Sequence, residues 1–299
     1  MDKQSPGVGF AYLILTFFLW GSVYVAGKLG SAQIPPFLLS ALRCVIATPI
    51  LLLMARKHLG VRIEPEDRKY FLLVGFLGYY MTFDLVQLGV HLTGASTAAL
   101  VNSFNPVAIM LLSACFLRER ITPVKLLCLV LAMTGTVIVA GGAHGKGELL
   151  GILSTLLATV TWGIAAVCIR RLTAKYPAIL VTAYGMVLSL IPHIPTGLAN
   201  ALRQPPQFDL RTLLTVLYLA LIGTAFAQFT WAKALARFPA GTCSLFYPLQ
   251  AVFSALLGAV ILNEKFTAAF FLGLAFVAAD VVLSTRETAR EAARTVDND

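Results

Sequence analysis

Ten apolar runs constrain the fold of this chain more than any other feature of its sequence. About 20 apolar residues coiled as an α-helix cross a lipid bilayer, and the backbone of such a helix satisfies its own hydrogen bonds. The sequence therefore predicts an all-α integral membrane protein with ten transmembrane helices. The expected spans are residues 8–28, 36–55, 70–90, 95–117, 123–141, 148–170, 178–199, 211–234, 240–262 and 267–285.

The composition agrees with lipid as the solvent for most of the chain. Of the 299 residues, 58% are hydrophobic and only 12% are charged, whereas about a quarter of a soluble domain is charged. This excludes a water-soluble enzyme. The formal net charge of +9 would suggest nucleic-acid binding in a soluble protein. Here, lysines and arginines that hold loops at the cytoplasmic surface explain it, and no nucleic-acid partner is expected.

The distribution of basic residues predicts the orientation in the membrane. With the N-terminus inside, the cytoplasmic segments hold 17 of the 23 Lys and Arg residues, and the opposite side holds 5. The remaining one, Arg43, lies within a span. Because cytoplasmic loops carry the excess of Lys and Arg, we expect both termini to be cytoplasmic.

The segment 95–122 recurs 145 residues later in the chain. Its polar interruptions recur as well, since Asn102 falls on Tyr247 and Asn105 falls on Gln250. Nine positions of the segment are identical in the second copy: Ala95, Thr97, Leu100, Val107, Leu112, Ala114, Leu117, Glu119 and Thr122.

The repeat predicts an inverted duplication. Each unit holds five spans, which is an odd number, so the second unit enters the membrane from the opposite side. We expect a first five-helix repeat over residues 1–143 and a second, inverted one over residues 144–299, with a short cytoplasmic tail. Two such halves can exchange inward-open and outward-open roles, which is typical of alternating-access carriers and disfavours a channel.

Polar and aromatic side chains within the spans predict a central cavity, because polar residues in lipid should face the bundle interior. They concentrate on three equivalent helices of each half, and they could ring one site near the midplane. Some could instead anchor helices at the interface or tie them together. The predicted substrate-binding residues are Trp20, Tyr24, Tyr79, Tyr80, Asp84, Asn102, Asn105, Trp162, Gln228, Trp231, Tyr247 and Gln250.

Three charged residues lie inside the expected spans: Arg43, Asp84 and Asp280. Each costs roughly 2.5–3.5 kcal/mol at a helix centre on insertion scales, so each needs a partner or water. We expect Asp84 to pair with Arg43, and the alternative is that Asp84 is a proton-coupling acid. Asp280 is closer to the cytoplasmic end of its helix and is expected to be structural or solvated.

Prolines and acidic helix ends mark the fourth and ninth spans. Pro106 aligns with Ala251, while Pro248 lies one turn earlier. Because proline interrupts a helix, the two halves are expected to bend at different depths. Glu119 and Glu264 lie at opposite membrane faces, and we interpret them as topological or packing elements.

Several catalytic motifs are absent from the sequence. Residues 145–147 read Gly-Lys-Gly, without the upstream glycine and the following Ser or Thr of a Walker A motif. Neither an HExxH nor a GxSxG motif occurs, and no set of metal ligands is clustered. We therefore expect no cofactor, no metal and no ATPase subunit, and a monomer whose partners are a small-molecule substrate and the bilayer.

The paired motifs resemble those of a known family. A Trp-Gly pair stands in the first helix of each half, at 20–21 and 162–163, and Leu-Arg-Glu-Arg at 117–120 is echoed by Leu-Asn-Glu-Lys at 262–265. This pattern is similar to the EamA branch of the drug/metabolite transporter superfamily. Within that branch, the chain is most similar to the aromatic amino acid exporters of the bacterial inner membrane. It departs from the family at Ala251, where the family has proline.

The resemblance implies a multi-pass inner-membrane transporter that exports aromatic or other neutral amino acids and related small metabolites through a central cavity. One alternative is an exporter of drugs or of another metabolite class, such as sugar derivatives. A more distant alternative is a membrane enzyme or sensor. The sequence leaves open which substrate is carried and whether facilitated diffusion or proton coupling drives its transport.

Overall fold

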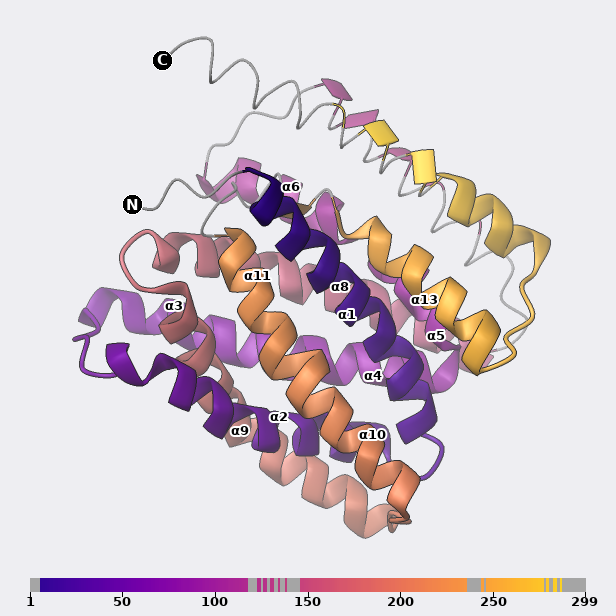
Figure 1. Ribbon diagram of the computed structural model, residues 1–299, viewed down its shortest axis with the longest axis horizontal. Coiled ribbons are helices and arrows are strands. Elements are labelled where there is room, and N and C mark those ends of the chain that lie inside the picture. Colours follow the sequence, from indigo (N-terminus) through magenta and orange to yellow (C-terminus); the bar gives the residue numbers. More distant parts are fainter. Residues whose placement is uncertain are drawn as a thin grey trace.

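Every regular element in the described part of the chain is helical (Figure 1). The computed structural model describes residues 6–117, 146–235 and 243–276 apart from residue 245, with scattered positions in 123–138 and 278–286. Within these residues, six helical segments are long and apolar enough to cross a membrane. They are Val8–Gly30, Pro36–His58, Pro65–Leu92, Gly147–Thr173, Ala178–Arg203 and Leu210–Trp231.

These segments confirm six of the ten expected spans. The expected span 123–141 and the first residues of 240–262 lie largely outside the described residues. Most of the expected span 267–285 is described, and residues 268–276 are helical. Four long helices are continuous: α1 (Pro6–Gly30), α2 (Pro36–Ala55), α8 (Lys146–Thr173) and α9 (Ala178–Arg203). Short 3-10 turns, η1 (Arg56–His58) and η2 (Pro65–Asp67), follow α2.

Two spans contain a π-helical segment in their middle. In the first half, η3 (Val74–Met81) joins α3 (Arg68–Leu73) to α4 (Thr82–Leu92). In the second half, η4 (Leu221–Phe226) joins α10 (Leu210–Ala220) to α11 (Ala227–Leu235). Subtracting the 145-residue offset places η4 on residues 76–81, within η3, so the two halves share this irregularity.

A threonine hydroxyl donates a hydrogen bond to a backbone carbonyl at each π-helix. The hydroxyl of Thr82 donates to the carbonyl of Leu77 at 2.8 Å, and that of Thr224 donates to the carbonyl of Leu219 at 2.8 Å. Both bonds reach back five residues, which is the spacing of a π-helix. The Leu77 carbonyl also accepts from the backbone N–H of Thr82, so the hydroxyl adds a second hydrogen bond to it.

The fourth span is broken at two residues. It consists of α5 (Ala95–Asn102) and α6 (Asn105–Leu117), with a turn at residues 103–104 between them. In the second half, a turn at residues 246–247 precedes α13 (Pro248–Ile261). With the 145-residue offset, that turn falls on residues 101–102, two residues before its counterpart. The halves are thus interrupted at different depths, as the positions of the two prolines predict.

Loop contacts place the connections at two ends of the bundle. At one end, the Lys175 ammonium lies 2.7 Å from the Glu64 carboxylate and 3.0 Å from that of Asp67. At the other end, Asp209 caps α10 by accepting from the backbone of Thr212 at 2.7 Å, and the side chain of Gln33 donates to Asp209 at 3.2 Å. The hydrogen bonds from Thr212 hold the pKa of Asp209 at about 2. These pairings agree with the alternation of sides assumed in the charge count.

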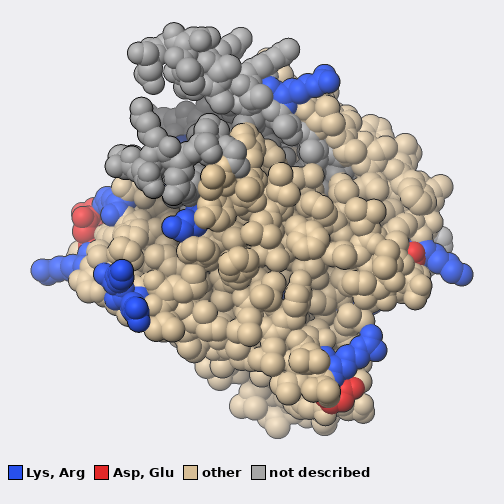
Figure 2. Space-filling model, in the orientation of Figure 1, with Lys and Arg blue, Asp and Glu red and all other residues tan. Residues whose placement is uncertain are grey.

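The outer surface carries the large apolar side chains that lipid would cover. Phe116, Ile191 and Val260 are 71%, 69% and 80% exposed. On the face shown in Figure 2, charged side chains lie towards the margins and leave a broad uncharged surface between them. Exposed apolar surface of this extent is typical of a membrane or partner contact. Together with the six spans, it identifies an integral membrane protein.

Glu264 links the second half to the first. Its carboxylate accepts from the backbone nitrogens of Ala95 at 2.9 Å and Ser96 at 3.3 Å, at the start of α5. Asn263 precedes it in a left-handed conformation (φ 52°) after α13. A carboxylate at a helix N-terminus satisfies unpaired amide groups and complements the helix dipole. Glu264 is therefore a packing element, as predicted. Glu119, its counterpart, lies outside the described residues.

Replacing Glu264 with alanine should destabilise the fold, because two amide groups at the start of α5 lose their acceptor. We expect a loss of about 1–2 kcal/mol, measured as a lower melting temperature of the purified protein in detergent. Glu66→Ala removes an exposed carboxylate and serves as the control. Equal melting temperatures for the Glu264 variant and the control would contradict the capping role.

Candidate functional site

A cavity of about 70 Å³ lies where helices of both halves meet. A buried water needs roughly 10–15 Å³ on this measure, so the cavity has room for a few waters. In Figure 1, α1 runs across the molecule between α11 and α13, and it contacts both of them. The lining residues are Trp20, Val23, Tyr24, Arg43, Thr82, Phe83, Val86, Asn102, Asn105, Trp162, Gln228, Tyr247 and Gln250.

The breaks in the helices bring amide side chains to this cavity. Asn102 ends α5 and Asn105 begins α6, on either side of the turn at residues 103–104. Gln250 follows the turn in the second half, and Gln228 lies just after η4. Interrupted helices at membrane depth are found where they line a cavity or a binding site. The local breaks in the sequence pattern therefore explain where the polar groups converge.

These four amides are buried without enough hydrogen-bond partners. Asn102, Asn105, Gln228 and Gln250 are 7%, 2%, 2% and 1% exposed. Within the described residues, the Oδ1 atoms of both asparagines, Oε1 of Gln228 and Nε2 of Gln250 have no partner. A buried polar atom left unpaired costs about 1–3 kcal/mol, so the cavity favours an occupant that supplies donors and acceptors.

An aromatic wall closes one side of the cavity. Trp162 Nε1 donates a hydrogen bond to the hydroxyl of Tyr247. The Trp20 ring meets Trp162 edge-on at a centroid distance of 6.2 Å and lies 5.7 Å from Tyr247. Trp162 and Tyr247 are 5% and 2% exposed. Three rings held against one another give a rigid apolar surface beside the amides.

Contacts along α1 close the bundle on both sides of the cavity. On the N-terminal side, the Thr16 hydroxyl donates to that of Thr230 on α11 at 2.8 Å. On the C-terminal side, Gln87 of α4 donates to the carbonyl of Gly27 at 3.0 Å. A Cβ on Gly27 would lie only 2.9 Å from the Gln87 side chain, so glycine allows this close approach. Trp20 and Tyr24 face the cavity between these two contacts.

The structure brings eight of the twelve predicted site residues together in the cavity lining: Trp20, Tyr24, Asn102, Asn105, Trp162, Gln228, Tyr247 and Gln250. Two others support the wall from behind. Tyr79 packs edge-on against Trp162 at 6.2 Å, and Trp231 lies 5.2 Å from Trp20. Tyr80 and Asp84 point elsewhere. That any of the twelve contacts substrate stays a prediction.

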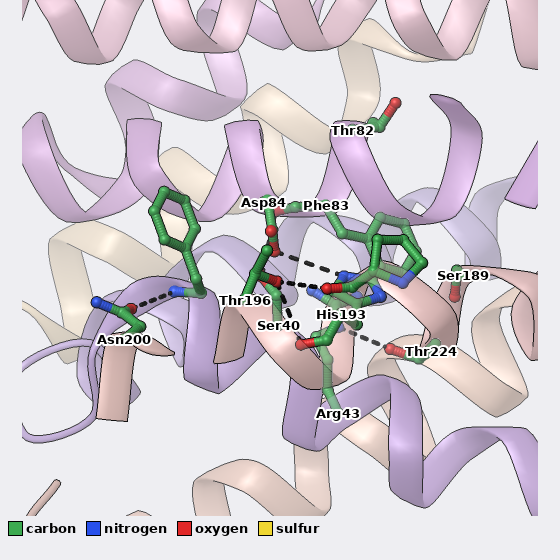
Figure 3. Close-up of polar contacts among 12 residues, drawn as sticks. Ser40, Arg43, Thr82, Phe83, Asp84, Ser189, His193, Thr196, Asn200 and Thr224 are labelled. Carbon is green, nitrogen blue, oxygen red and sulfur yellow. Dashed lines mark hydrogen bonds and ion pairs between the residues drawn. The ribbon is translucent and has the colours of Figure 1, made fainter. Parts of the chain in front are cut away.

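Asp84 pairs with a histidine and not with Arg43, so the expected ion pair is wrong (Figure 3). Its Oδ1 lies 3.5 Å from Nε2 of His193 on α9, which is close enough for an ion pair but long for a hydrogen bond. The ring of Tyr80 meets His193 edge-on at 5.0 Å. Sequence spacing predicted that Tyr80 and Asp84 share a face, but that face meets α9, where His193 is fully buried.

Arg43 is the cavity residue that the sequence interpretation misplaced. Its Nε donates to the hydroxyl of Thr224 at 2.9 Å, and its guanidinium lies 4.5 Å above the Phe83 ring. Thr82, Phe83 and Val86 of α4 also line the cavity and were not predicted. The signal for Arg43 was present, because a charge inside a span marks a functional position by default. Phe83 and Val86 carry no such signal.

Comparison with known proteins decides the family. The EamA-like transporter family matches residues 7–141 and again residues 149–286. The chain belongs to this family. Its two matched segments indicate duplicated halves, and the family makes it a membrane transporter of a small molecule and not an enzyme. Within the described residues, no group of His, Cys, Asp or Glu is placed to hold a metal ion.

Several known transporters are similar to this chain along most of their length. An uncharacterized transporter of Archaeoglobus fulgidus is 28% identical over 92% of this chain and 98% of its own length. A probable amino-acid metabolite efflux pump of Escherichia coli is 25% identical over 88% and 90%, and one of Salmonella typhimurium is 26% identical over 93% and 96%. A solved crystal structure shares the fold with a TM-score of 0.71 and 22% identity, over 96% and 99% of the two chains.

The pair of Asp84 and His193 should stabilise the contact between α4 and α9. Replacing His193 with phenylalanine keeps an aromatic ring beside Tyr80 but leaves a buried carboxyl group without its partner. We expect a loss of about 1–3 kcal/mol, measured by thermal unfolding in detergent, and recovery when Asp84→Asn is added. His58→Phe, at a partly exposed position, is the control. An unchanged stability of the single variant would show that the contact contributes nothing.

Proposed function

We propose that this transporter exports neutral amino acids, aromatic or otherwise, and related small metabolites by alternating access through the central cavity. The observation that carries the proposal is the set of four buried amides with unpartnered atoms beside a wall of aromatic rings. An amide offers both a donor and an acceptor. The cavity therefore suits a small solute that has a polar, zwitterionic end and an apolar side chain.

Substrate entry requires the bundle to open, because the cavity has room for only a few waters as it stands. The two contacts along α1, Thr16 with Thr230 and Gln87 with Gly27, lie on opposite sides of the cavity. Each would separate in turn as the two halves rock around the site, which is the motion that inverted repeats allow. Ring surfaces of Trp20 and Trp162 would hold the substrate side chain.

Two relatives of the chain support an amino-acid substrate. The proteins of Escherichia coli and Salmonella typhimurium are described as probable amino-acid metabolite efflux pumps. The excess of Lys and Arg on one side supports an orientation with both termini in the cytoplasm. We further propose that the chain works as a monomer, organised as ten spans in two inverted repeats, in a bacterial inner membrane.

Removing the amide of Asn102 or the indole of Trp162 should impair export. We expect Asn102→Ala and Trp162→Ala each to lower the efflux rate by about tenfold, because each removes a hydrogen-bonding group or a wall of the site. The measurement is efflux of labelled neutral amino acids from proteoliposomes loaded with them.

Gln204→Ala removes an exposed amide in the loop after α9 and should leave efflux unchanged. Variant proteins are compared at equal amounts after their thermal unfolding has been measured, so that misfolding is recognised. Full efflux by both cavity variants would refute the site assignment. Failure of the unaltered protein to move any amino acid would refute the substrate class.

A further inference from the structure

Arg43 is a buried cation with no anion beside it in the described part of the chain. It is 5% exposed, and it extends from α2 towards η4, where it meets Thr224 (Figure 3). Other charged groups in the described residues do have partners: Lys175 pairs with Glu64 and Asp67, and His193 lies 3.5 Å from Asp84. Arg43 lies over the ring of Phe83. The next residue, Asp84, carries a carboxylate, but that carboxylate contacts His193 and not Arg43. A buried charge normally needs a partner of opposite sign.

The surroundings of Arg43 fix its orientation without neutralising it. Thr224 accepts from Nε, and the Phe83 ring lies beneath the guanidinium plane. Nε is the only Arg43 atom with a hydrogen bond to the residues that the structure describes. The two terminal nitrogens thus keep their donors, in the fork that matches a carboxylate. Arg43 itself lines the central cavity.

The unpartnered amide atoms in the same cavity have mostly the opposite character. Oδ1 of Asn102, Oδ1 of Asn105 and Oε1 of Gln228 are acceptors that lack a donor. A solute with a carboxylate would take the donors of Arg43, and a solute with an ammonium group would supply these oxygens. One cavity thus contains complementary groups for both charges of a zwitterion.

We propose that Arg43 binds the carboxylate of the substrate and thereby makes the transporter selective for carboxylate-bearing solutes. The inference rests on the proposed role of the cavity as the substrate site and names the chemical group recognised there. A solute without the carboxylate leaves the guanidinium buried and unpaired, which penalises its binding. The amide oxygens then favour amino acids over simple carboxylates, because only amino acids supply the ammonium donors.

The test uses the purified full-length protein and four related probes. Phenylalanine has both charges, phenylalanine amide and phenethylamine lack the carboxylate, and 3-phenylpropionate lacks the ammonium group. Their binding is measured as competition in phenylalanine counterflow and, independently of transport, as the rise of the melting temperature in detergent. In the unaltered protein we expect phenylalanine to compete at least about tenfold better than its amide or amine, since one partner of a buried charge pair is missing from them.

Substitution of Arg43 should remove this discrimination. In Arg43→Gln, we expect phenylalanine and 3-phenylpropionate to lose affinity by about tenfold or more, while phenylalanine amide changes little. Arg43→Lys keeps the charge and should retain part of the preference for the carboxylate, which a purely structural role would not predict. Arg171→Gln removes an exposed arginine and should leave the ratios of the four probes unchanged.

Each outcome decides the proposal. Equal competition by phenylalanine and its amide in the unaltered protein overturns it, whether or not the Arg43 variants fold. An undiminished preference for the carboxylate in folded Arg43→Gln also overturns it, while the proposed export of amino acids still stands. If no amino acid is transported but 3-phenylpropionate raises the melting temperature only when Arg43 is present, the carboxylate site is supported and the proposed transport substrate is wrong.

Discussion

The absence of water from the bilayer interior governs this structure, because every polar group within the spans must find a partner inside the bundle. The backbone meets this requirement by forming helices along most of the described spans. Side chains meet it in pairs, such as Thr16 with Thr230, or they converge on the central cavity. In the described part of the chain, four amides each keep one atom without a partner, and all four line that cavity. Their placement distinguishes a site for a polar solute from a bundle that only packs.

Irregular helices make the cavity polar. The breaks before Asn105 and Pro248 and the π-helical segment η4 lie beside the amide side chains that line the cavity. These irregularities recur in both halves, but their positions differ by up to two residues from the 145-residue offset. The two halves are therefore similar but not identical around the cavity.

Helical spacing predicted much of the cavity but could not say which neighbour each face meets. Asn102, Asn105, Tyr247 and Gln250 were found because polar residues interrupt apolar runs at matched positions of the repeat. Tyr80 and Asp84 share a face, as their spacing indicates, but that face packs against α9. Arg43 was assigned to the wrong partner because its distance from Asp84 depends on the rotation of α2 and α4 about their axes. Spacing within one helix carries no information about that rotation.

The sequence by itself determined the solvent, the helical class, the duplication and most of the residues that face the interior. Hydropathy and period are properties of each segment, and lipid permits few other solutions for an apolar chain. Only the tertiary structure decided that Asp84 meets His193, that Glu264 caps α5 from the other half, and that Arg43 enters the cavity with no anion from the described residues beside it. The first two contacts join residues more than 100 positions apart, and the environment of Arg43 depends on which side chains surround it. The packing of the helices decides each of these features.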